Sequence, residues 1–219
     1  MKKILFTFYF IGLGMLVGAQ GTNDKKMLEN IAKMKSAATV QNFTDLRYSF
    51  ASMAGNGSSS WLPYYYTALS SLKEGEAHLK NGQTQLAEDG PVTAAKYLDP
   101  VMEKEKNNAE FNILLGMIHS FKARLKGAEK DMKLAAGYLA AAEKLDPKNP
   151  RAALLKAEIK YFTPEDNGGN KAQGIELYKE ALKKFDSYKI KTKLDPDWGR
   201  DVAEYYASFN QPALTLLTK

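Results

Sequence analysis

The sequence predicts an all-α protein, and three observations support this prediction. Alanine, leucine, lysine and glutamate are abundant, whereas the long alternation of apolar and polar residues that marks a half-buried strand is missing from the sequence. The apolar fraction of 44% is high enough for a folded core in a chain of 219 residues. A triplet of residues spaced to share one face of a helix also recurs along the chain.

The triplet is clearest at Ala135, Leu139 and Ala142, which occupy positions i, i+4 and i+7 of a helix. The sequence Asp-Pro-Lys-Asn-Pro follows, and its two prolines cannot continue that helix. Similar triplets begin at Ala94 and Gly174, 41 residues before and 39 residues after Ala135. A period near 40 residues is typical of an array of helical hairpins.

Apolar periodicity and turn residues divide the rest of the chain into helices. Leu28, Ile31 and Met34 are expected to share the buried face of the first one. A kink is expected at Asp99-Pro100, inside a helix. The helices are expected near residues 24–38, 40–53, 61–79, 83–89, 92–105, 109–126, 128–144, 151–162, 171–184 and 201–209, followed by a tail over 210–219.

Residues 1–19 have the pattern of a secretory signal peptide. Lys2 and Lys3 precede an apolar run, and Val-Gly-Ala provides small residues for cleavage after Ala19. An uncleaved anchor is the less favoured alternative, because the run is short for a membrane span. No cysteine follows, so neither a lipid anchor nor a disulfide is expected. We therefore expect a periplasmic or secreted protein, with residues 20–219 forming one domain and no stable membrane insertion after cleavage.

The charge pattern argues against nucleic-acid binding. The formal net charge of +6 falls to +4 once the two lysines of the leader are removed, and lysines alternate with glutamates along the helices, as on solvated faces. Lys189, Lys191 and Lys193 are the nearest approach to a basic cluster. Binding of an anion or a charged surface there is left open as a minor alternative.

The three triplets, the Leu115-Gly116 pair and the Asp146–Pro150 junction resemble the tetratricopeptide-repeat (TPR) family over residues 61–184. Pro164, Gly168-Gly169 and Trp198-Gly199 are similar to elements of divergent TPR-like proteins exported by bacteria. The resemblance implies a TPR-like α-α superhelix (solenoid) of about four helical hairpins with a C-terminal capping helix over 195–209. The repeats here exceed the standard length of about 34 residues.

If the TPR register applies, the chain is a non-catalytic scaffold that binds a protein or peptide in a concave groove. The alternative on the same surface is that the N-terminal hairpin or the C-terminal helix fills the groove. A second hypothesis is a small-molecule-binding accessory protein of envelope uptake, with its ligand near Trp61, Tyr66 and His119. The oligomeric state does not follow from the sequence. The residues expected to line the groove are Leu62, Tyr66, Glu110, Met117, Ser120, Arg151, Glu158 and Tyr161.

No catalytic, metal or cofactor site is expected. The chain has no cysteine, and its two histidines, His78 and His119, do not form a zinc-binding spacing. The loop over 165–170 lacks the ligand spacing of an EF-hand, so we expect a turn in which Asn170 caps the next helix, with anion binding there as the less favoured alternative. A weak enzyme hypothesis places Glu110 or Glu158 within hydrogen-bond reach of His119.

Overall fold

The structure is a computed structural model that describes residues 23–54 and 60–210. Over this part of the chain the regular elements are all helices and no strand occurs, which confirms the all-α prediction. The expected signal peptide and all but the first residue of the expected tail lie outside the described residues. Within the described ranges, no helix combines the length and the apolar composition needed to cross a membrane.

The observed helices agree closely with the expected ones. The first helix covers residues 23–36. The later α-helices are α2 (Val40–Ala54), α3 (Leu62–Lys80), α4 (Thr84–Ala87), α5 (Asp89–Leu98), α6 (Met102–Glu105), α7 (Ala109–Lys126), α8 (Glu129–Leu145), α9 (Pro150–Phe162), α10 (Lys171–Ser187) and α11 (Arg200–Ala207). Short 3-10 turns occur at η1 (Asp99–Val101), η2 (Glu165–Asn167) and η3 (Ser208–Asn210).

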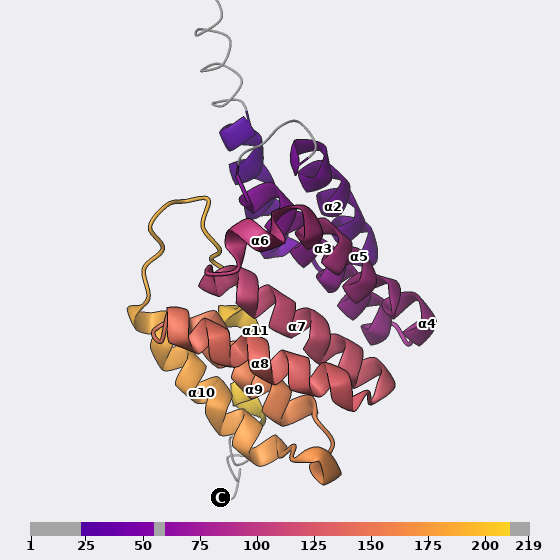
Figure 1. Cartoon of the computed structure of the whole chain (residues 1–219), viewed down its shortest axis with the longest axis vertical. Coiled ribbons are helices and arrows are strands. Elements are labelled where there is room, and N and C mark those ends of the chain that lie inside the picture. The colour runs from indigo at the N-terminus through magenta and orange to yellow at the C-terminus, as the bar shows by residue number, and fades with distance from the viewer. Residues whose placement is uncertain (1–22, 55–59, 211–219) are drawn as a thin grey trace, which may run out of the picture.

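Sequence-adjacent helices pack against each other, and the resulting pairs follow one another along the long axis of the molecule (Figure 1). The pairs are α3 with α5, α7 with α8, and α9 with α10, while α5 with α7 and α7 with α9 join one pair to the next. At the indigo end, α2 packs on α3; α11 packs on α10 and is partly hidden behind other helices in this view.

The triplets form the contacts between paired helices, as expected. The two later triplets, which begin at Ala135 and Gly174, are buried at all three positions, and the first is buried at Ala94 and Leu98. Gly116 of α7 permits a close approach, since a Cβ atom there would lie 2.6 Å from Leu155 Cδ2. The tight approach is to α9 of the next pair, whereas the nearest atoms of the partner helix α8 lie 3.5 Å from the same Cβ position.

Polar side chains fix where several helices begin. The side chains of Asn108, Asn149 and Asn170 each accept a hydrogen bond from a backbone N–H in the first turn of the helix that follows. The cap expected at Asn170 is confirmed. Pro100 interrupts its helix as expected, because α5 ends at Leu98 and η1 precedes α6.

Two expectations about helix faces and limits were wrong. Leu28 is exposed, and Met27 is buried with Ile31 instead, because the buried stripe of the first helix is rotated by one residue. The helix expected from Val92 begins at Asp89, because Pro91 is accommodated in the first turn of α5.

The segment between α10 and α11 returns along the helical pairs. Residues 188–199, which we call the C-terminal segment, contain no helix. Gly199 at its end has a φ of +98°, a left-handed conformation that favours glycine. Trp198 packs against both hydrophobic clusters, one built mainly from helices up to α9 and the other from α9, α10 and α11. The C-terminal segment therefore joins the two ends of the core.

A pair of glycine substitutions tests the packing of the third triplet. A Cβ atom at Gly174 would lie 2.7 Å from Tyr161 Cβ and 2.9 Å from Tyr161 Cα, whereas a Cβ at Gly137 meets nothing within 4 Å. We expect Gly174→Ala to lower the free energy of unfolding by about 1–3 kcal/mol, and Gly137→Ala to raise it by about 0.5–1 kcal/mol. Urea unfolding of both variants checks this, and a stabilising Gly174→Ala would contradict the packing described.

Candidate functional site

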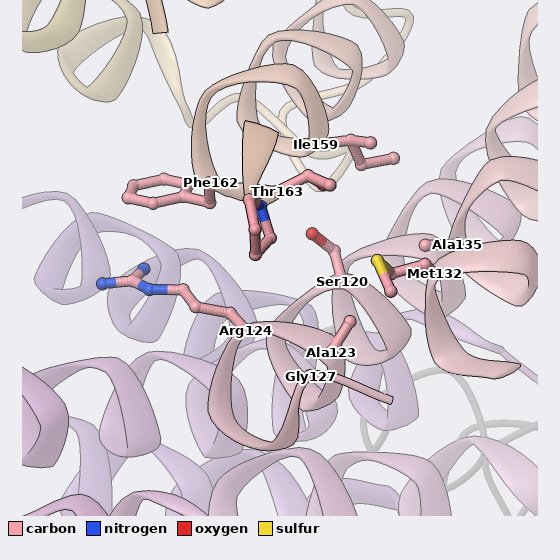
Figure 2. A pocket seen from close by; sticks show the side chains of 10 residues that line it. Ser120, Ala123, Arg124, Gly127, Met132, Ala135, Ile159, Phe162 and Thr163 are labelled. Atoms are coloured by element: carbon pink, nitrogen blue, oxygen red, sulfur yellow. The ribbon is translucent and has the colours of Figure 1, made fainter. Parts of the chain in front are cut away.

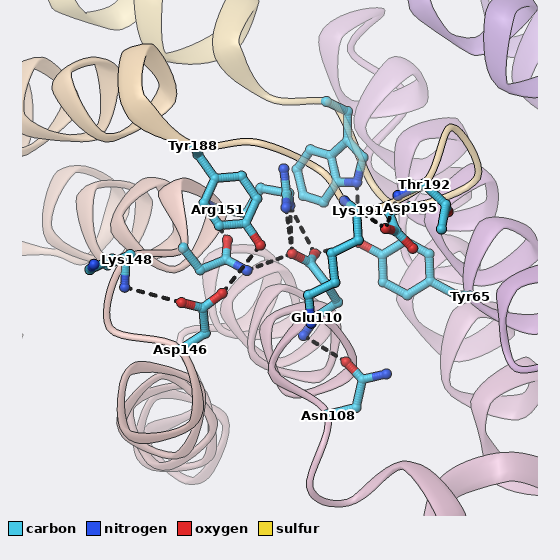
Figure 3. Close-up of polar contacts among 12 residues, drawn as sticks. Tyr65, Asn108, Glu110, Asp146, Lys148, Arg151, Tyr188, Lys191, Thr192 and Asp195 are labelled. Atoms are coloured by element: carbon cyan, nitrogen blue, oxygen red, sulfur yellow. Dashed lines mark hydrogen bonds and ion pairs between the residues drawn. The ribbon is translucent and has the colours of Figure 1, made fainter.

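A buried ion pair joins α7 to α9 (Figure 3). Arg151, on the first turn of α9, has 2% of its side chain exposed, and Glu110, on the first turn of α7, has 11%. Arg151 Nε donates hydrogen bonds of 2.8 Å to both carboxylate oxygens of Glu110. Burial lowers the pKa of Arg151, but the adjacent Glu110 carboxylate more than offsets this and keeps the guanidinium charged.

Further hydrogen bonds extend this pair toward α3 and the C-terminal segment. Asn149 Nδ2 donates to Glu110 at 2.6 Å, and the hydroxyl of Tyr65 donates to Glu110 at 3.3 Å. The indole N–H of Trp198 donates to the Tyr65 hydroxyl at 3.1 Å. Burial raises the pKa of Tyr65 well above its ordinary value, so it remains a neutral donor. The Glu110 carboxylate thus connects α3, α7, α9 and Trp198.

Three other contacts attach the C-terminal segment to the helices. The Tyr66 hydroxyl donates to the Leu194 carbonyl at 3.1 Å, and the Tyr188 hydroxyl donates to Asp146 at 3.2 Å. Lys35 Nζ forms an ion pair of 2.8 Å with Asp197, which joins residues 162 positions apart in the sequence. These contacts hold the segment against the predicted groove positions Tyr66, Glu110 and Arg151.

A cleft of about 370 Å³, which we call the apolar cleft, lies where the two ends of the described chain meet. Its volume is within the usual range for small-molecule sites, roughly 300–1,000 Å³. The first helix, α2, α3 and the residues around the start of α11 surround it. Its lining residues are Ile31, Met34, Lys35, Ala37, Phe43, Tyr66, Leu69, Lys73, Asp197, Trp198, Gly199, Arg200, Asp201, Val202 and Glu204.

Charged side chains border the apolar cleft. Lys35 and Arg200 are about half exposed, and each is paired with a carboxylate. Lys73 is 18% exposed and forms an ion pair of 2.7 Å with Glu76, while its ammonium lies 6.0 Å from the centre of the Trp198 ring. Burial lowers the pKa of Lys73, but the carboxylates of Glu76 and Glu158 together raise it above its ordinary value. Lys73 is therefore a partly buried cation at the wall of the cleft.

Glu158 of α9 is close enough to Lys73 to interact with it electrostatically. It is partly buried and forms no hydrogen bond or ion pair with another described residue. Burial raises the pKa of Glu158 to about 7, which the charges of Lys73 and Arg124 only partly oppose.

Two further pockets involve residues of α7 and α9. A pocket of about 90 Å³ lies between the C-terminal ends of α7 and α9, with Ser120 and Met132 among its lining residues (Figure 2). Arg124 reaches across Phe162 there, with 4.1 Å from the guanidinium carbon to the ring centre. A polar cleft of about 670 Å³ lies under the C-terminal segment, beside Trp61, Arg151 and Lys191.

The eight residues predicted to line a groove have different positions in the structure. Tyr66, Glu110, Met117 and Arg151 are buried, and three of these make the internal contacts described above. Leu62, Ser120, Glu158 and Tyr161 are partly exposed. Tyr66 lines the apolar cleft, Ser120 lines the small pocket, and Glu110 and Arg151 line the polar cleft. The predicted groove residues therefore do not line a single groove in the structure.

The residues suggested for a small ligand are also separated. Tyr66 lines the apolar cleft, whereas Trp61 lines the polar cleft. His119 Nδ1 lies 2.7 Å from Asp131, and its ring stacks on Tyr138 of α8. The weak enzyme hypothesis loses its geometric basis, since the structure pairs His119 with Asp131 rather than with Glu110 or Glu158.

Within the described part of the chain, no group of three or more histidine, aspartate, glutamate or cysteine side chains is arranged to hold a metal ion. Sequence reasoning missed Met34, Phe43 and Lys73 as lining residues of the apolar cleft. The helical periodicity of Met34 indicated only a buried face, and no sequence signal singled out Phe43 or Lys73. Tyr66 was predicted as a binding residue and does line this cleft, whereas the nearby Trp198-Gly199 pair was assigned to the C-terminal cap.

The comparisons with known proteins give a fold but no family. Neither a protein family nor a curated protein sequence matches this chain. The structure is similar to that of the HusA haemophore from Porphyromonas gingivalis, with a TM-score of 0.69 and 21% sequence identity. The similarity covers 87% of this chain and 96% of the haemophore chain. At this identity the similarity shows a shared fold.

Removal of one partner tests the importance of the buried ion pair. We expect Glu110→Ala to lower the free energy of unfolding by about 3–5 kcal/mol, because it leaves the buried Arg151 charge without a partner. Glu176→Ala, which removes an exposed partner of Lys179, is the matched control and should change the free energy by less than about 1 kcal/mol. Equal effects of the two substitutions in urea unfolding would show that the buried pair is dispensable.

The raised pKa of Glu158 predicts a pH-dependent stability. Between its ordinary value of 4.5 and about 7, the folded protein holds a proton on Glu158 that the unfolded chain releases. This contribution to stability is fully present below pH 4.5 and is lost as the pH rises through 7. We expect Glu158→Gln to be nearly neutral at pH 4.5 and stabilising by about 1–3 kcal/mol at pH 8, as measured by thermal unfolding. A difference from the wild type that is independent of pH would contradict the shift.

Proposed function

We propose that this protein is an exported, non-catalytic carrier that binds a flat, apolar ligand bearing carboxylates, of which haem is the leading candidate. The observation that carries the proposal is the apolar cleft, in which aliphatic and aromatic side chains surround a space of ligand size beside a partly buried lysine. The similarity in fold to a haemophore, a protein that carries haem, supports the choice of ligand.

The chemistry of the cleft suits a porphyrin. Met34, Phe43, Leu69 and Trp198 provide apolar surface for the faces of a planar ring. The ammonium of Lys73 lies at the wall of the same cleft, where it could pair with a carboxylate at the edge of the ring. One cleft therefore combines an apolar surface with a cation, the two features that such a ligand requires.

We expect the ring and its carboxylates, rather than the iron, to provide most of the affinity. No histidine occurs among the described residues that line the apolar cleft, where Met34 and Tyr66 are the side chains of types that haem iron accepts. Burial raises the pKa of Tyr66, and its hydroxyl already donates to Leu194, so a phenolate is disfavoured. Iron-free protoporphyrin should bind with an affinity within about tenfold of that of haem.

The protein- or peptide-binding scaffold predicted first has less support. Three of its proposed contact residues make contacts inside the protein instead. Arg151 donates to Glu110, and Tyr66 donates to Leu194 of the C-terminal segment. The TPR-like superhelix itself remains our proposal, supported by the consecutive helical pairs and the buried triplets. Export through a signal peptide cleaved after Ala19 also remains a proposal, and the intact mass of the exported protein would test it.

A substitution in the cleft, with a matched control, tests the proposed function. Met34→Glu places a charge on the apolar wall, and we expect it to weaken the binding of protoporphyrin at least tenfold. Met132→Glu makes the same change at the small pocket of Figure 2 and should leave binding unchanged. Titration of each purified protein with protoporphyrin, followed by quenching of tryptophan fluorescence, gives the dissociation constants.

Circular dichroism and thermal unfolding would establish that both variants fold. Equal loss of binding in the two variants, or binding by both at the wild-type level, would count against the apolar cleft as the site. Absence of binding by the wild type to both haem and protoporphyrin at micromolar concentration would contradict the proposed function as a whole.

A further inference from the structure

An exposed ion pair joins the two walls between which a ligand in the apolar cleft would lie. Lys35 of the first helix and Asp197 of the C-terminal segment both line this cleft, and 2.8 Å separates Lys35 Nζ from a carboxylate oxygen of Asp197. Met34, which precedes Lys35 in the sequence, lines the same cleft, and so does Trp198, which follows Asp197. A flat ring between Met34 and Trp198 therefore has this ion pair at its edge.

The formal charges of the described residues that line the apolar cleft balance one another. Three of these residues are cations and three are carboxylates: Lys35, Lys73, Arg200, Asp197, Asp201 and Glu204. A ligand with two carboxylates adds negative charge to this balanced lining. Its carboxylates gain most when a carboxylate of the protein gives up its cation to them.

Lys35 is the cation of the cleft that a ligand can reach at least cost. In the described part of the chain its ammonium forms an ion pair with Asp197 and makes no other hydrogen bond or ion pair. Arg200, by contrast, is held by two carboxylates, those of Asp186 and Glu204. A ligand therefore has to displace one carboxylate to reach Lys35 and two to reach Arg200.

The exposure of this ion pair favours such a displacement. The side chains of Lys35 and Asp197 are 54% and 52% exposed. An exposed ion pair contributes little to stability, because water solvates both charges when they separate. Asp197 can leave Lys35 and remain hydrated, and a ligand carboxylate then takes its place beside the ammonium. The exchange leaves the number of ion pairs unchanged.

We propose that Lys35 is a second carboxylate-binding residue of the apolar cleft, and that a ligand carboxylate displaces Asp197 from it. This inference rests on the proposed function, in which Lys73 binds the other carboxylate. The cleft thereby selects flat apolar ligands that carry two carboxylates over those that carry one or none. Asp197 occupies Lys35 until such a ligand binds.

Two substitutions that break the same ion pair should change binding in opposite directions. Lys35→Met removes the cation and should weaken the binding of protoporphyrin about two- to fivefold, the size expected for an exposed ion pair. Asp197→Asn removes the competing carboxylate and leaves Lys35 free, so it should strengthen binding by a similar factor. The uncharged dimethyl ester of protoporphyrin should bind to both variants as it binds to the wild type. Fluorescence titration gives the dissociation constants, and thermal unfolding establishes that each variant folds.

The double variant Lys35→Met/Asp197→Asn separates displacement at Lys35 from a general effect of charge. If Asp197 acts by occupying Lys35, its removal has no effect once that lysine is absent. The double variant should then bind protoporphyrin as weakly as Lys35→Met. Glu176→Gln and Lys179→Met, which break an exposed ion pair of α10 away from the apolar cleft, are the matched controls and should leave binding unchanged.

An ion pair that only held the two walls together would give a different result. Both single substitutions would then change the binding of protoporphyrin in the same direction and would affect the dimethyl ester as well. That result, an unchanged affinity in both single variants, or an effect of Asp197→Asn that persists without Lys35 would overturn this inference and leave the proposed function intact. Failure of the wild type to bind either probe would overturn the proposed function and this inference together.

Discussion

The buried ion pair between Glu110 and Arg151 is the centre of a polar network that links α3, α7, α9 and Trp198. Taking two charges out of water costs several kcal/mol for each ion, and that cost is recovered only when the pair is well aligned and its other oxygen lone pairs are used. Here Arg151 bonds both oxygens of Glu110, and Asn149 and Tyr65 supply further donors. The carboxylate can be satisfied in this way only when α3, α7 and α9 are correctly placed. We therefore infer that the pair helps to specify the arrangement of these helices.

The position of the apolar cleft depends on this network. Tyr65, which donates to Glu110, also accepts the indole N–H of Trp198, and Trp198 forms one wall of the cleft. The neighbouring Tyr66 hydroxyl fixes Leu194 of the same segment. Residues near both ends of the described chain thereby form one site, although more than 160 positions separate Met34 from Trp198 in the sequence. A buried polar network thus positions one wall of the apolar cleft.

The helices could be predicted from the sequence because their signals are local. Periodicity, prolines and turn residues placed α7 correctly and most other helices within a few residues, and the Ala135 triplet identified a buried seam. The candidate site could not be predicted in the same way. Lys73 has the sequence pattern of an ordinary lysine on a helix surface, and its role follows from the approach of Trp198 and Glu158 from distant segments.

Contacts between segments far apart in the sequence also explain why some predictions were wrong. Glu110 and Arg151 were expected to line a concave groove, either open or filled by the chain itself, but the segment after α10 folds back over them and they form a buried pair. No local feature of residues 188–199 indicated that return, since they contain no regular helix and their contacts are with positions far away in the chain. His119, chosen for its chemistry, is instead paired with Asp131 one helix away.

The most direct measurement of the central claim is a crystal structure of the protein grown with iron-free protoporphyrin. Our account predicts difference density for one ring in the apolar cleft, between Met34 and Trp198, with a carboxylate of the ring beside the Lys73 ammonium. Density for the ring in the polar cleft or on the outer surface, with the apolar cleft empty, would contradict it.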